Sequence, residues 1–141
     1  MELINFKTRL MLAFDSIVLI DDDPINNLIN KRLLNRLNLC NEIAEFLEAE
    51  NALKEIKRLD SDKRLLIFLD INMPIMNGWD FLKKYEQICS HRDDIILMLS
   101  SSIDYQDRKK SRMFKPVKGF IEKPLTNQKL FEILPEYVKN E

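Results

Sequence analysis

The chain has 141 residues, of which 45% are hydrophobic and 32% are charged, and its formal net charge is -1. This length suits one domain with a core of its own, and the composition excludes a disordered chain. The balance of 22 basic and 23 acidic residues argues against a surface built as a whole for nucleic acid.

Runs of residues that are apolar throughout predict strands buried on both faces, as in parallel sheets. Such runs lie at residues 17–20, 65–69 and 95–99, and Val117 with Phe120 and Ile121 marks a further strand. A weaker strand is expected at 43–47. Apolar residues at helical spacing predict helices between them. These helices are expected over residues 25–33, 49–59, 79–88 and 130–138. Residues 103–114 give the least clear pattern because half of them are charged, and Pro116 follows closely, so a helix there is expected to be short or mobile.

Two of the predicted helices have features that bear on packing. The first carries one apolar face, which repeats at i, i+3, i+4 and i+8 and is made of Ile25, Leu28, Ile29 and Leu33. The last carries Leu130, Phe131, Leu134 and Val138, and Pro135 is expected to kink or shorten it.

Strand and helix alternate five times along the chain. This order is typical of an α/β protein with an open, doubly wound parallel sheet and helices on both sides. In such sheets the ligand site lies beyond the carboxyl ends of the strands. The residues that directly follow each apolar run are therefore the candidates for function.

Polar residues follow four of the predicted strands. Asp21 and Asp22 follow the first, Asp70 the third, Ser100 the fourth and Lys123 the fifth. Carboxylates gathered in one place repel one another unless a cation joins them, and oxygen ligands without His or Cys favour a hard ion. The sequence therefore predicts an Mg²⁺ site, with Mn²⁺ as an alternative ion. A carboxylate beside the metal and an ammonium group is suited to attack phosphorus.

Ordinary structural roles are also open to these residues. Asp23, followed by Pro24, is expected to cap the helix that begins there. Taken singly, Ser100 would suit a turn and Lys123 would suit a solvated position. Capping needs only one of the three consecutive aspartates, however, so the grouping at the strand ends favours a site.

Other classes of site find little support in the sequence. Cys40, Cys89 and His91 do not have the spacing of a zinc site, and His91 is expected at the surface rather than as a phosphoryl carrier. No stretch approaches the roughly 20 apolar residues that span a membrane. We expect a cytoplasmic protein with reduced thiols and no membrane contact. Residues 1–15 are expected to form a leader of uncertain order before a domain over residues 16–141.

Three segments carry a resemblance to a known family. Residues 18–24 (VLIDDDP), 68–78 (FLDINMPIMNG) and 119–125 (GFIEKPL) look like the receiver domains of response regulators from two-component signalling systems. The resemblance covers nearly the whole chain, and its motifs fall in family order. It implies a stand-alone receiver with a flavodoxin-like (βα)5 fold and strand order 2-1-3-4-5.

The resemblance assigns the acceptor and the metal ligands. Asp70 would be the phospho-acceptor. The Mg²⁺ ligands would be Asp21, Asp22, Asp70 and the backbone carbonyl of Asn72.

The resemblance also assigns the switch residues. Ser100 would be the switch hydroxyl, Phe120 the switch aromatic, and Lys123 the lysine that contacts the phosphoryl group. The Lys123–Pro124 peptide bond stands where the family often has a cis bond.

The resemblance implies a signalling switch rather than a conventional enzyme. A phosphohistidine on a sensor histidine kinase or a histidine phosphotransfer protein would donate the phosphoryl group, and the chain would catalyse only its own phosphorylation and dephosphorylation. A protein partner of unknown identity would receive the signal, and no nucleic acid is expected.

Two alternatives remain. One is a receiver-like interaction module that works without phosphorylation. The other is a phosphatase of the haloacid dehalogenase type with Asp21 as nucleophile. The second leaves Asp70 without a role and lacks the acidic pair that such enzymes carry after the lysine.

A basic run departs from the family pattern in the region of the fourth helix, which also lacks the usual small residues. It consists of Arg108, Lys109, Lys110, Arg112 and Lys115. It can be a solvated face or a surface for an acidic partner. Direct nucleic-acid binding is disfavoured because the run has no interleaved aromatic residues for stacking.

Overall fold

The computed structural model describes residues 13–38, 40, 42–102 and 104–134, and these form a three-layer α/β structure. Five parallel strands lie in the order β2-β1-β3-β4-β5. They are β1 (Ser16–Ile20), β2 (Ile43–Phe46), β3 (Leu65–Asp70), β4 (Ile95–Ser100) and β5 (Val117–Glu122). The helices are α2 (Pro24–Leu37), α3 (Ala49–Arg58), α4 (Gly78–Ile88), α5 (Tyr105–Ser111) and α6 (Asn127–Ile133).

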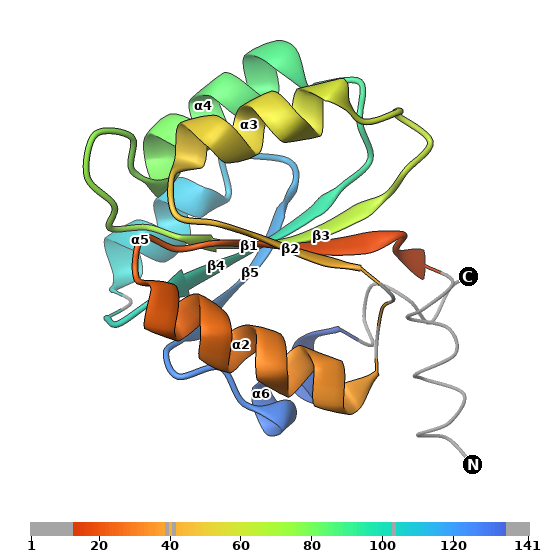
Figure 1. Ribbon diagram of the computed structural model, residues 1–141. Coiled ribbons are helices and arrows are strands. Elements are labelled where there is room, and N and C mark those ends of the chain that lie inside the picture. Colours follow the sequence, from red (N-terminus) through yellow and green to blue (C-terminus); the bar gives the residue numbers. More distant parts are fainter. Residues whose placement is uncertain (1–12, 39, 41, 103, 135–141) are drawn as a thin grey trace.

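Helices cover both faces of the sheet, so the predicted doubly wound fold and its strand order are confirmed. In Figure 1, α3 and α4 lie on one face and α2 and α6 lie on the other. None of the helices in the described ranges is long and apolar enough to cross a membrane. The helix predicted around residues 103–114 is short, as expected, and comprises seven residues.

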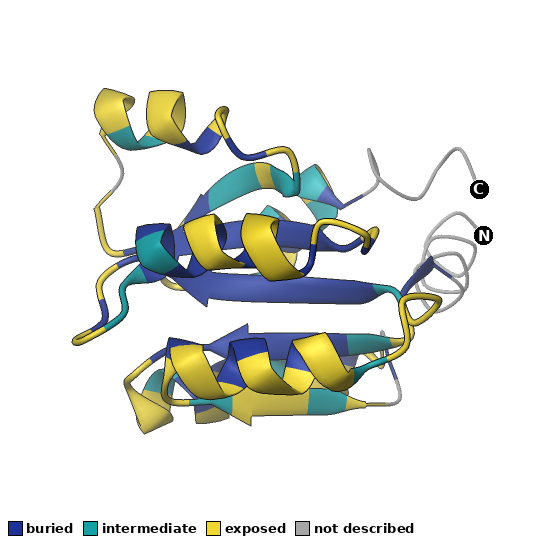
Figure 2. Cartoon of the chain, turned by 90° about the horizontal axis from the view of Figure 1, so that it is seen from above, coloured by how far each residue is buried: buried dark blue, intermediate teal, exposed yellow. Residues whose placement is uncertain are grey.

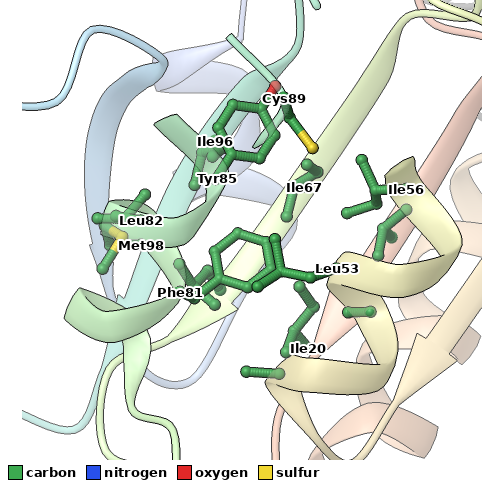
Figure 3. Close-up of a cluster of buried hydrophobic side chains, with 14 of the residues drawn as sticks. Ile20, Leu53, Ile56, Ile67, Phe81, Leu82, Tyr85, Cys89, Ile96 and Met98 are labelled. Atoms are coloured by element: carbon green, nitrogen blue, oxygen red, sulfur yellow. The ribbon is translucent and has the colours of Figure 1, made fainter. Parts of the chain in front are cut away.

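The central strands are apolar throughout because their side chains alternate between two cores. All six residues of β3 are buried, and adjacent residues face opposite sides of the sheet. Phe68 packs with the core beneath α2 and α6, whereas Ile67 packs with the core beneath α3 and α4. Figure 3 shows the second core, where Phe81 of α4 lies next to Leu53 of α3 and Leu82 lies beside Met98 of β4. Each such buried side chain contributes about 1.5–3 kcal/mol.

The predicted apolar face of α2 is wrong as a description of what the helix buries. Ile25, Leu28 and Ile29 are 63%, 45% and 55% exposed. The buried residues are Asn27, Asn30, Leu34 and Leu37. The Asn27 amide donates to the carbonyls of Asp21 and Phe46, at 3.0 and 3.2 Å, and so ties α2 to the ends of β1 and β2. The helix is turned toward these polar contacts, so three residues of the predicted face are left at the surface and only Leu33 packs partly against the core.

The ends of the chain are only partly described. Ala13 and Phe14, at the end of the predicted leader, are buried, and the Arg64 guanidinium lies 5.0 Å from the centre of the Phe14 ring. Residues 1–12, and the predicted roles of Pro135 and Val138, lie outside the described residues. At the described end of α6, Leu130 and Leu134 are fully buried, in line with the predicted helical face.

Candidate functional site

Three carboxylates come together at the carboxyl ends of β1 and β3. Asp21 follows β1 directly and Asp70 ends β3, and the residues are 2% and 4% exposed. Asp22 is exposed beside them. Each of the three offers an oxygen, and these oxygens lie within 4.8 Å of one another. The parallel arrangement of β1 and β3 explains this meeting, because it brings their carboxyl ends to the same edge of the sheet.

Lys123 joins this cluster from the end of β5. Its Nζ lies 2.9 Å from Oδ2 of Asp21 and 3.1 Å from Oδ1 of Asp70. Its backbone N–H donates to the Ser100 carbonyl at 2.8 Å, which fixes the end of β5 beside the end of β4. The Lys123–Pro124 peptide bond is cis, in agreement with the expectation. The ammonium group thus bridges a metal-ligand candidate and the candidate acceptor.

The turn after β1 holds Asp21 and begins α2. The Asp23 side chain accepts from the backbone N–H of Ile25 at 2.9 Å, so its predicted role as a helix cap is confirmed. Oδ1 of Asp21 accepts from the backbone N–H of Asp23 at 2.9 Å. Oδ2 of Asp21 accepts from the Asn26 amide at 3.4 Å. These donors orient the Asp21 carboxylate toward the cluster.

The loop after Asp70 folds back tightly onto the strand end. The N–H of Gly78 donates to the Ile71 carbonyl at 2.8 Å, and a side chain at Gly78 would place its Cβ 2.7 Å from the Asp70 carbonyl oxygen. Within the loop, the Met76 N–H donates to the Pro74 carbonyl across Ile75, whose φ is 69°. This conformation is unfavourable for a β-branched residue. The loop therefore holds a strained shape next to the candidate acceptor.

Of the predicted switch residues, Ser100 ends β4 and Phe120 lies within β5. Ser100 is buried, and its hydroxyl donates to the Ser102 carbonyl at 2.7 Å. Phe120 is half-buried in β5 and packs 6.4 Å from the Trp79 ring. Asn72 is exposed, and the metal-ligand role of its carbonyl stays a prediction.

The electrostatics of the cluster leave room for a further cation. The pKa of Asp70 is raised to about 6, mainly by burial and then by the Asp21 carboxylate, while Lys123 opposes the rise. Burial alone would lower the pKa of Lys123, but its hydrogen bond to Asp21 and the charge of Asp70 raise it above its ordinary value. One ammonium group therefore does not balance three carboxylates. An all-oxygen donor set of this kind fits Mg²⁺.

Residues 17–135 match the family model of the response regulator receiver domain. The chain belongs to this family. The receiver domain is 31% identical to "Two-component response regulator 24" of Arabidopsis thaliana over 83% of its own length. It spans 79% of that protein, but only 7% of a hybrid signal transduction histidine kinase of Dictyostelium discoideum to which it is 29% identical.

Solved structures agree with this assignment. A two-component response regulator from Cytophaga hutchinsonii is 31% identical, with a TM-score of 0.77 over 91% of this chain and 98% of that one. The receiver domain of the sensor histidine kinase PA1611 from Pseudomonas aeruginosa shares the fold, with 18% identity and a TM-score of 0.71 over 89% of this chain and 98% of that one. That structure has a magnesium ion coordinated in its active site cleft.

Two residues near the site of this receiver domain were not predicted from its sequence. Asn26 donates to Asp21, and Trp79 packs against Phe120. Asn26 carried a usable signal, because it lies one turn into the helix that Asp23 caps. Trp79 carried none, because its helical spacing with Leu82 and Tyr85 predicts only a core position.

The raised pKa of Asp70 predicts a pH-dependent stability for the metal-free receiver domain. The folded value is about 6 and the ordinary value is 3.8, so the folded state binds this proton more tightly. The stabilisation that proton binding to Asp70 gives the folded state is complete at pH values below the ordinary pKa of 3.8, and it is lost as the pH rises through about 6. Asp70→Asn should remove it, so the variant should gain stability relative to wild type between about pH 4 and about pH 7. Urea denaturation in EDTA measures this, and a difference that does not vary with pH would contradict the assignment.

Proposed function

We propose that this receiver domain accepts a phosphoryl group on Asp70 from a phosphohistidine and thereby changes its affinity for a partner protein. The observation that carries the proposal is the position of Asp70 at one edge of the sheet, 3.1 Å from the Lys123 ammonium group and within 4.8 Å of the Asp21 and Asp22 carboxylates. The donor is a sensor histidine kinase or a histidine phosphotransfer protein. This choice is supported by the family of the chain.

Asp21, Asp22 and Asp70 would hold Mg²⁺, with the Asn72 carbonyl as a further ligand. The ion, when bound, neutralises charge on the phosphoryl oxygens. Support comes from the all-oxygen donor set and from the magnesium in the Pseudomonas aeruginosa receiver domain.

The chemistry assigned to this chain is the transfer of a phosphoryl group from a histidine nitrogen of the donor to a carboxylate oxygen of Asp70. The ionised Asp70 carboxylate attacks phosphorus, an O–P bond forms, and the P–N bond of the donor breaks. The electron pair of that bond returns to the imidazole, which takes up a proton. Lys123 offsets the charge on the phosphoryl oxygens. Water later attacks the same phosphorus, which releases inorganic phosphate and restores the carboxylate.

The switch would act through Ser100 and Phe120. In this structure the Ser100 hydroxyl donates to the Ser102 carbonyl, and a phosphoryl oxygen on Asp70 would compete for that donor. Movement of Ser100 would let Phe120 repack against Trp79, and so alter the surface beyond it. A change of this kind needs two conformations that differ by a few kcal/mol.

The exposed stripe of α2 supports docking of the donor near the site. Ile25, Leu28 and Ile29 follow the Asp21–Asp23 turn and leave an apolar surface next to it. A donor must bring its phosphohistidine to Asp70, and such a surface can hold it there. Cys40 and Cys89 are both buried and form no disulfide with each other, which supports a reducing compartment such as the cytoplasm.

Intact-mass spectrometry after incubation with acetyl phosphate tests the proposed function. Wild type should gain one phosphoryl group when Mg²⁺ is present and little without it, and Asp70→Asn should gain none. Asp23→Asn is the matched control, because it changes a neighbouring exposed aspartate and keeps a good helix cap. Loss of the adduct in Asp23→Asn as well, or its persistence in Asp70→Asn, would count against Asp70. Absence of any adduct on folded wild type would favour the phosphorylation-independent interaction module.

A further inference from the structure

A buried asparagine lies on α2 where the hydrophobic pattern of the helix would place an apolar residue. Asn27 is 2% exposed, whereas Ile25, Leu28 and Ile29 of the same helix are exposed. Burial of an amide in place of these side chains gives up hydrophobic stabilisation and costs the desolvation of a polar group. A local rule broken in this way is expected where a residue serves a site rather than the fold.

The amide of Asn27 completes the hydrogen bonding of the Asp21 backbone. Its Nδ2 donates to the Asp21 carbonyl at 3.0 Å and to the Phe46 carbonyl at 3.2 Å. The Phe46 carbonyl also accepts from the Asp21 N–H at 3.1 Å. Both backbone polar groups of Asp21 are therefore held, the N–H by β2 and the carbonyl by Asn27. The backbone of this metal-ligand candidate cannot turn without breaking one of these bonds.

The same bonds fasten the end of an edge strand. β2 has a neighbouring strand on one side only, which is β1. In Figure 2, β2 is the yellow and teal strand beside the dark blue β1. Phe46, its last residue, lies opposite Ile20, and Ile20 directly precedes Asp21. The end of an edge strand has few contacts and frays easily, so the amide of Asn27 keeps Phe46 and Asp21 together.

The remaining polar atom of the Asn27 side chain is not satisfied. Its Oδ1 is buried and has no hydrogen-bond partner among the described residues. A buried acceptor without a partner destabilises the folded state, and this cost offsets the gain from the two bonds of Nδ2. The fold therefore gains little from Asn27, and its effect is expected at the site instead.

The arrangement that Asn27 holds is an unfavourable one without a cation. Oxygens of Asp21, Asp22 and Asp70 lie within 4.8 Å of one another, and carboxylates this close repel. A loose turn after β1 would relieve the repulsion by letting Asp21 move away, and an ion would then have to draw it back. Because the Asp21 backbone is held, the ligands are gathered before the ion arrives.

We propose that Asn27 is a positioning residue for the cation site, which holds the Asp21 backbone so that the carboxylates of Asp21 and Asp22 bind a divalent ion more tightly. This inference deepens the proposed function and rests on it for the presence of the ion. Asn27 acts through the Asp21 carbonyl and needs no contact with the ion or with the phosphoryl group. Residues that orient a metal ligand in this way typically change the affinity by about tenfold to about a hundredfold.

Binding of Mn²⁺ to the full chain, followed by the EPR signal of the free ion and repeated with Mg²⁺ as competitor, measures the effect. Asn27→Leu removes both hydrogen bonds and keeps a similar volume, so the affinity for both ions should fall by about tenfold or more. Asn30→Leu is the matched control. Asn30 is also buried on α2, but its side chain donates no hydrogen bond to either strand end within the described residues. The control should bind both ions with an affinity close to that of wild type.

Urea denaturation in EDTA separates positioning from a merely structural role. A structural role predicts a lower denaturation midpoint for Asn27→Leu and an unchanged ion affinity of the folded protein. We expect the opposite pattern: a midpoint in EDTA close to that of wild type or higher, because the unsatisfied Oδ1 is gone and the carboxylates can move apart, together with the weaker ion binding. Asn27→Ala also removes both bonds and supplies the affinity in case the leucine variant does not fold.

Two results would overturn the role of Asn27 alone. One is a wild-type affinity for Mn²⁺ and Mg²⁺ in the folded Asn27 variants, and the other is an equal loss of affinity in Asn30→Leu. Absence of ion binding by folded wild type would instead overturn the cation site of the proposed function, and the inference with it.

The rate of phosphorylation by acetyl phosphate, measured across Mg²⁺ concentrations, gives a second readout. Asn27→Leu should need about tenfold more Mg²⁺ to reach half of its maximal rate, but that maximal rate should be close to the wild-type one, because Asp70 and Lys123 are unchanged. A lower maximal rate at saturating Mg²⁺ would overturn a role through ion affinity. Absence of the phosphoryl adduct on wild type that binds the ion would overturn the proposed function, and the ion affinities would still decide the role of Asn27.

Discussion

Asp94→Asn should lower the free energy of unfolding by about 3–5 kcal/mol, because it breaks a fully buried ion pair. The side chains of Arg92 and Asp94 are both completely buried, and Nε of Arg92 lies 2.8 Å from Oδ2 of Asp94. Asp94 also accepts from the Tyr85 hydroxyl at 2.6 Å and from the Leu65 N–H at 2.9 Å. In the variant, an NH₂ group in the place of Oδ2 would face the Tyr85 hydroxyl and Nε of Arg92, which are both hydrogen-bond donors. The Arg92 guanidinium would also lose its counter-charge.

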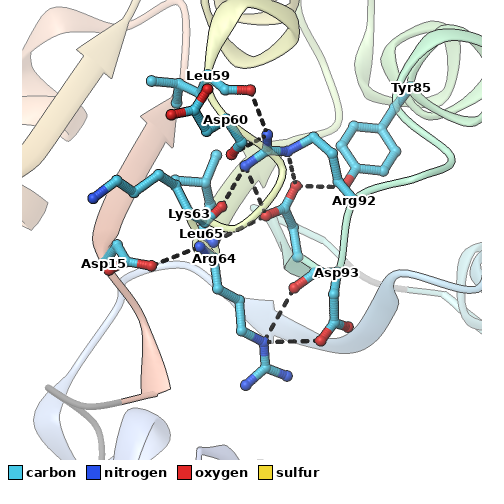
Figure 4. A network of polar contacts seen from close by, with 10 residues as sticks. Asp15, Leu59, Asp60, Lys63, Arg64, Leu65, Tyr85, Arg92 and Asp93 are labelled. Atoms are coloured by element: carbon cyan, nitrogen blue, oxygen red, sulfur yellow. Dashed lines mark hydrogen bonds and ion pairs between the residues drawn. The ribbon is translucent and has the colours of Figure 1, made fainter.

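The same network anchors a loop at the amino-terminal edge of the sheet. The Arg92 guanidinium donates to the carbonyls of Leu59, Asp60 and Lys63, as Figure 4 shows. These contacts connect the segment before β3 to the segment before β4. The Asp94→Asn substitution should therefore lower the free energy of unfolding of the whole domain rather than loosen one loop alone.

Asp93→Asn is the matched control, and urea denaturation is the measurement. Asp93 pairs with Arg64 at 3.5 Å, but its side chain is 87% exposed. Removal of this pair should cost less than about 1 kcal/mol. Equal and small losses in the two variants would show that the buried network does not stabilise the fold as described.

Gly78→Ala is expected to damage both stability and phosphorylation. Its Cβ would lie 2.7 Å from the Asp70 carbonyl oxygen and 2.9 Å from Cα of Ile71, and both are backbone atoms that cannot turn aside. The start of α4 would have to move away from the candidate acceptor. We expect a loss of about 1–3 kcal/mol in stability, and a fall of about tenfold or more in the rate of phosphorylation by acetyl phosphate.

The only other glycine of the chain provides the comparison. A Cβ at Gly119 would meet Cδ1 of Ile133 at 2.9 Å and Cδ2 of Leu97 at 3.4 Å, which are the ends of flexible side chains. Gly119→Ala should therefore cost less stability and leave phosphorylation close to that of wild type. Equal rates in the two variants would mean that the approach of Gly78 to Asp70 does not position the acceptor.

The fold and the core of the site could be predicted because a parallel sheet brings all strand ends of one sense to one edge. Asp21, Asp70 and Lys123 are far apart in sequence, but each lies at the carboxyl end of a predicted strand, so their meeting follows from the topology. The contacts of Lys123 with both aspartates confirm that arrangement. Each strand differs from its predicted bounds by one residue: polar residues such as Ser16 and Glu122 extend four of the strands, whereas β2 ends one residue earlier than predicted.

Other features could not be predicted because buried polar residues took positions that pattern analysis reserves for apolar ones. On α2, Asn27 is buried to satisfy two carbonyls, and Ile25 and Ile29 are left exposed. At the opposite end of the sheet, no pattern in the sequence marks Arg92 and Asp94 as buried, but their side chains are fully buried as an ion pair. Patterns of hydrophobicity carry no signal for partners of this kind.

The most direct test of the central claim is to identify the carboxylate that carries the phosphoryl group. Wild type is incubated with acetyl phosphate and Mg²⁺, reduced with borohydride, which converts an aspartyl phosphate to homoserine, and mapped by peptide mass spectrometry. We expect homoserine at residue 70 and unchanged aspartate at residues 21 and 22. Homoserine at residue 21 would contradict it and would instead support the phosphatase chemistry in which Asp21 is the nucleophile.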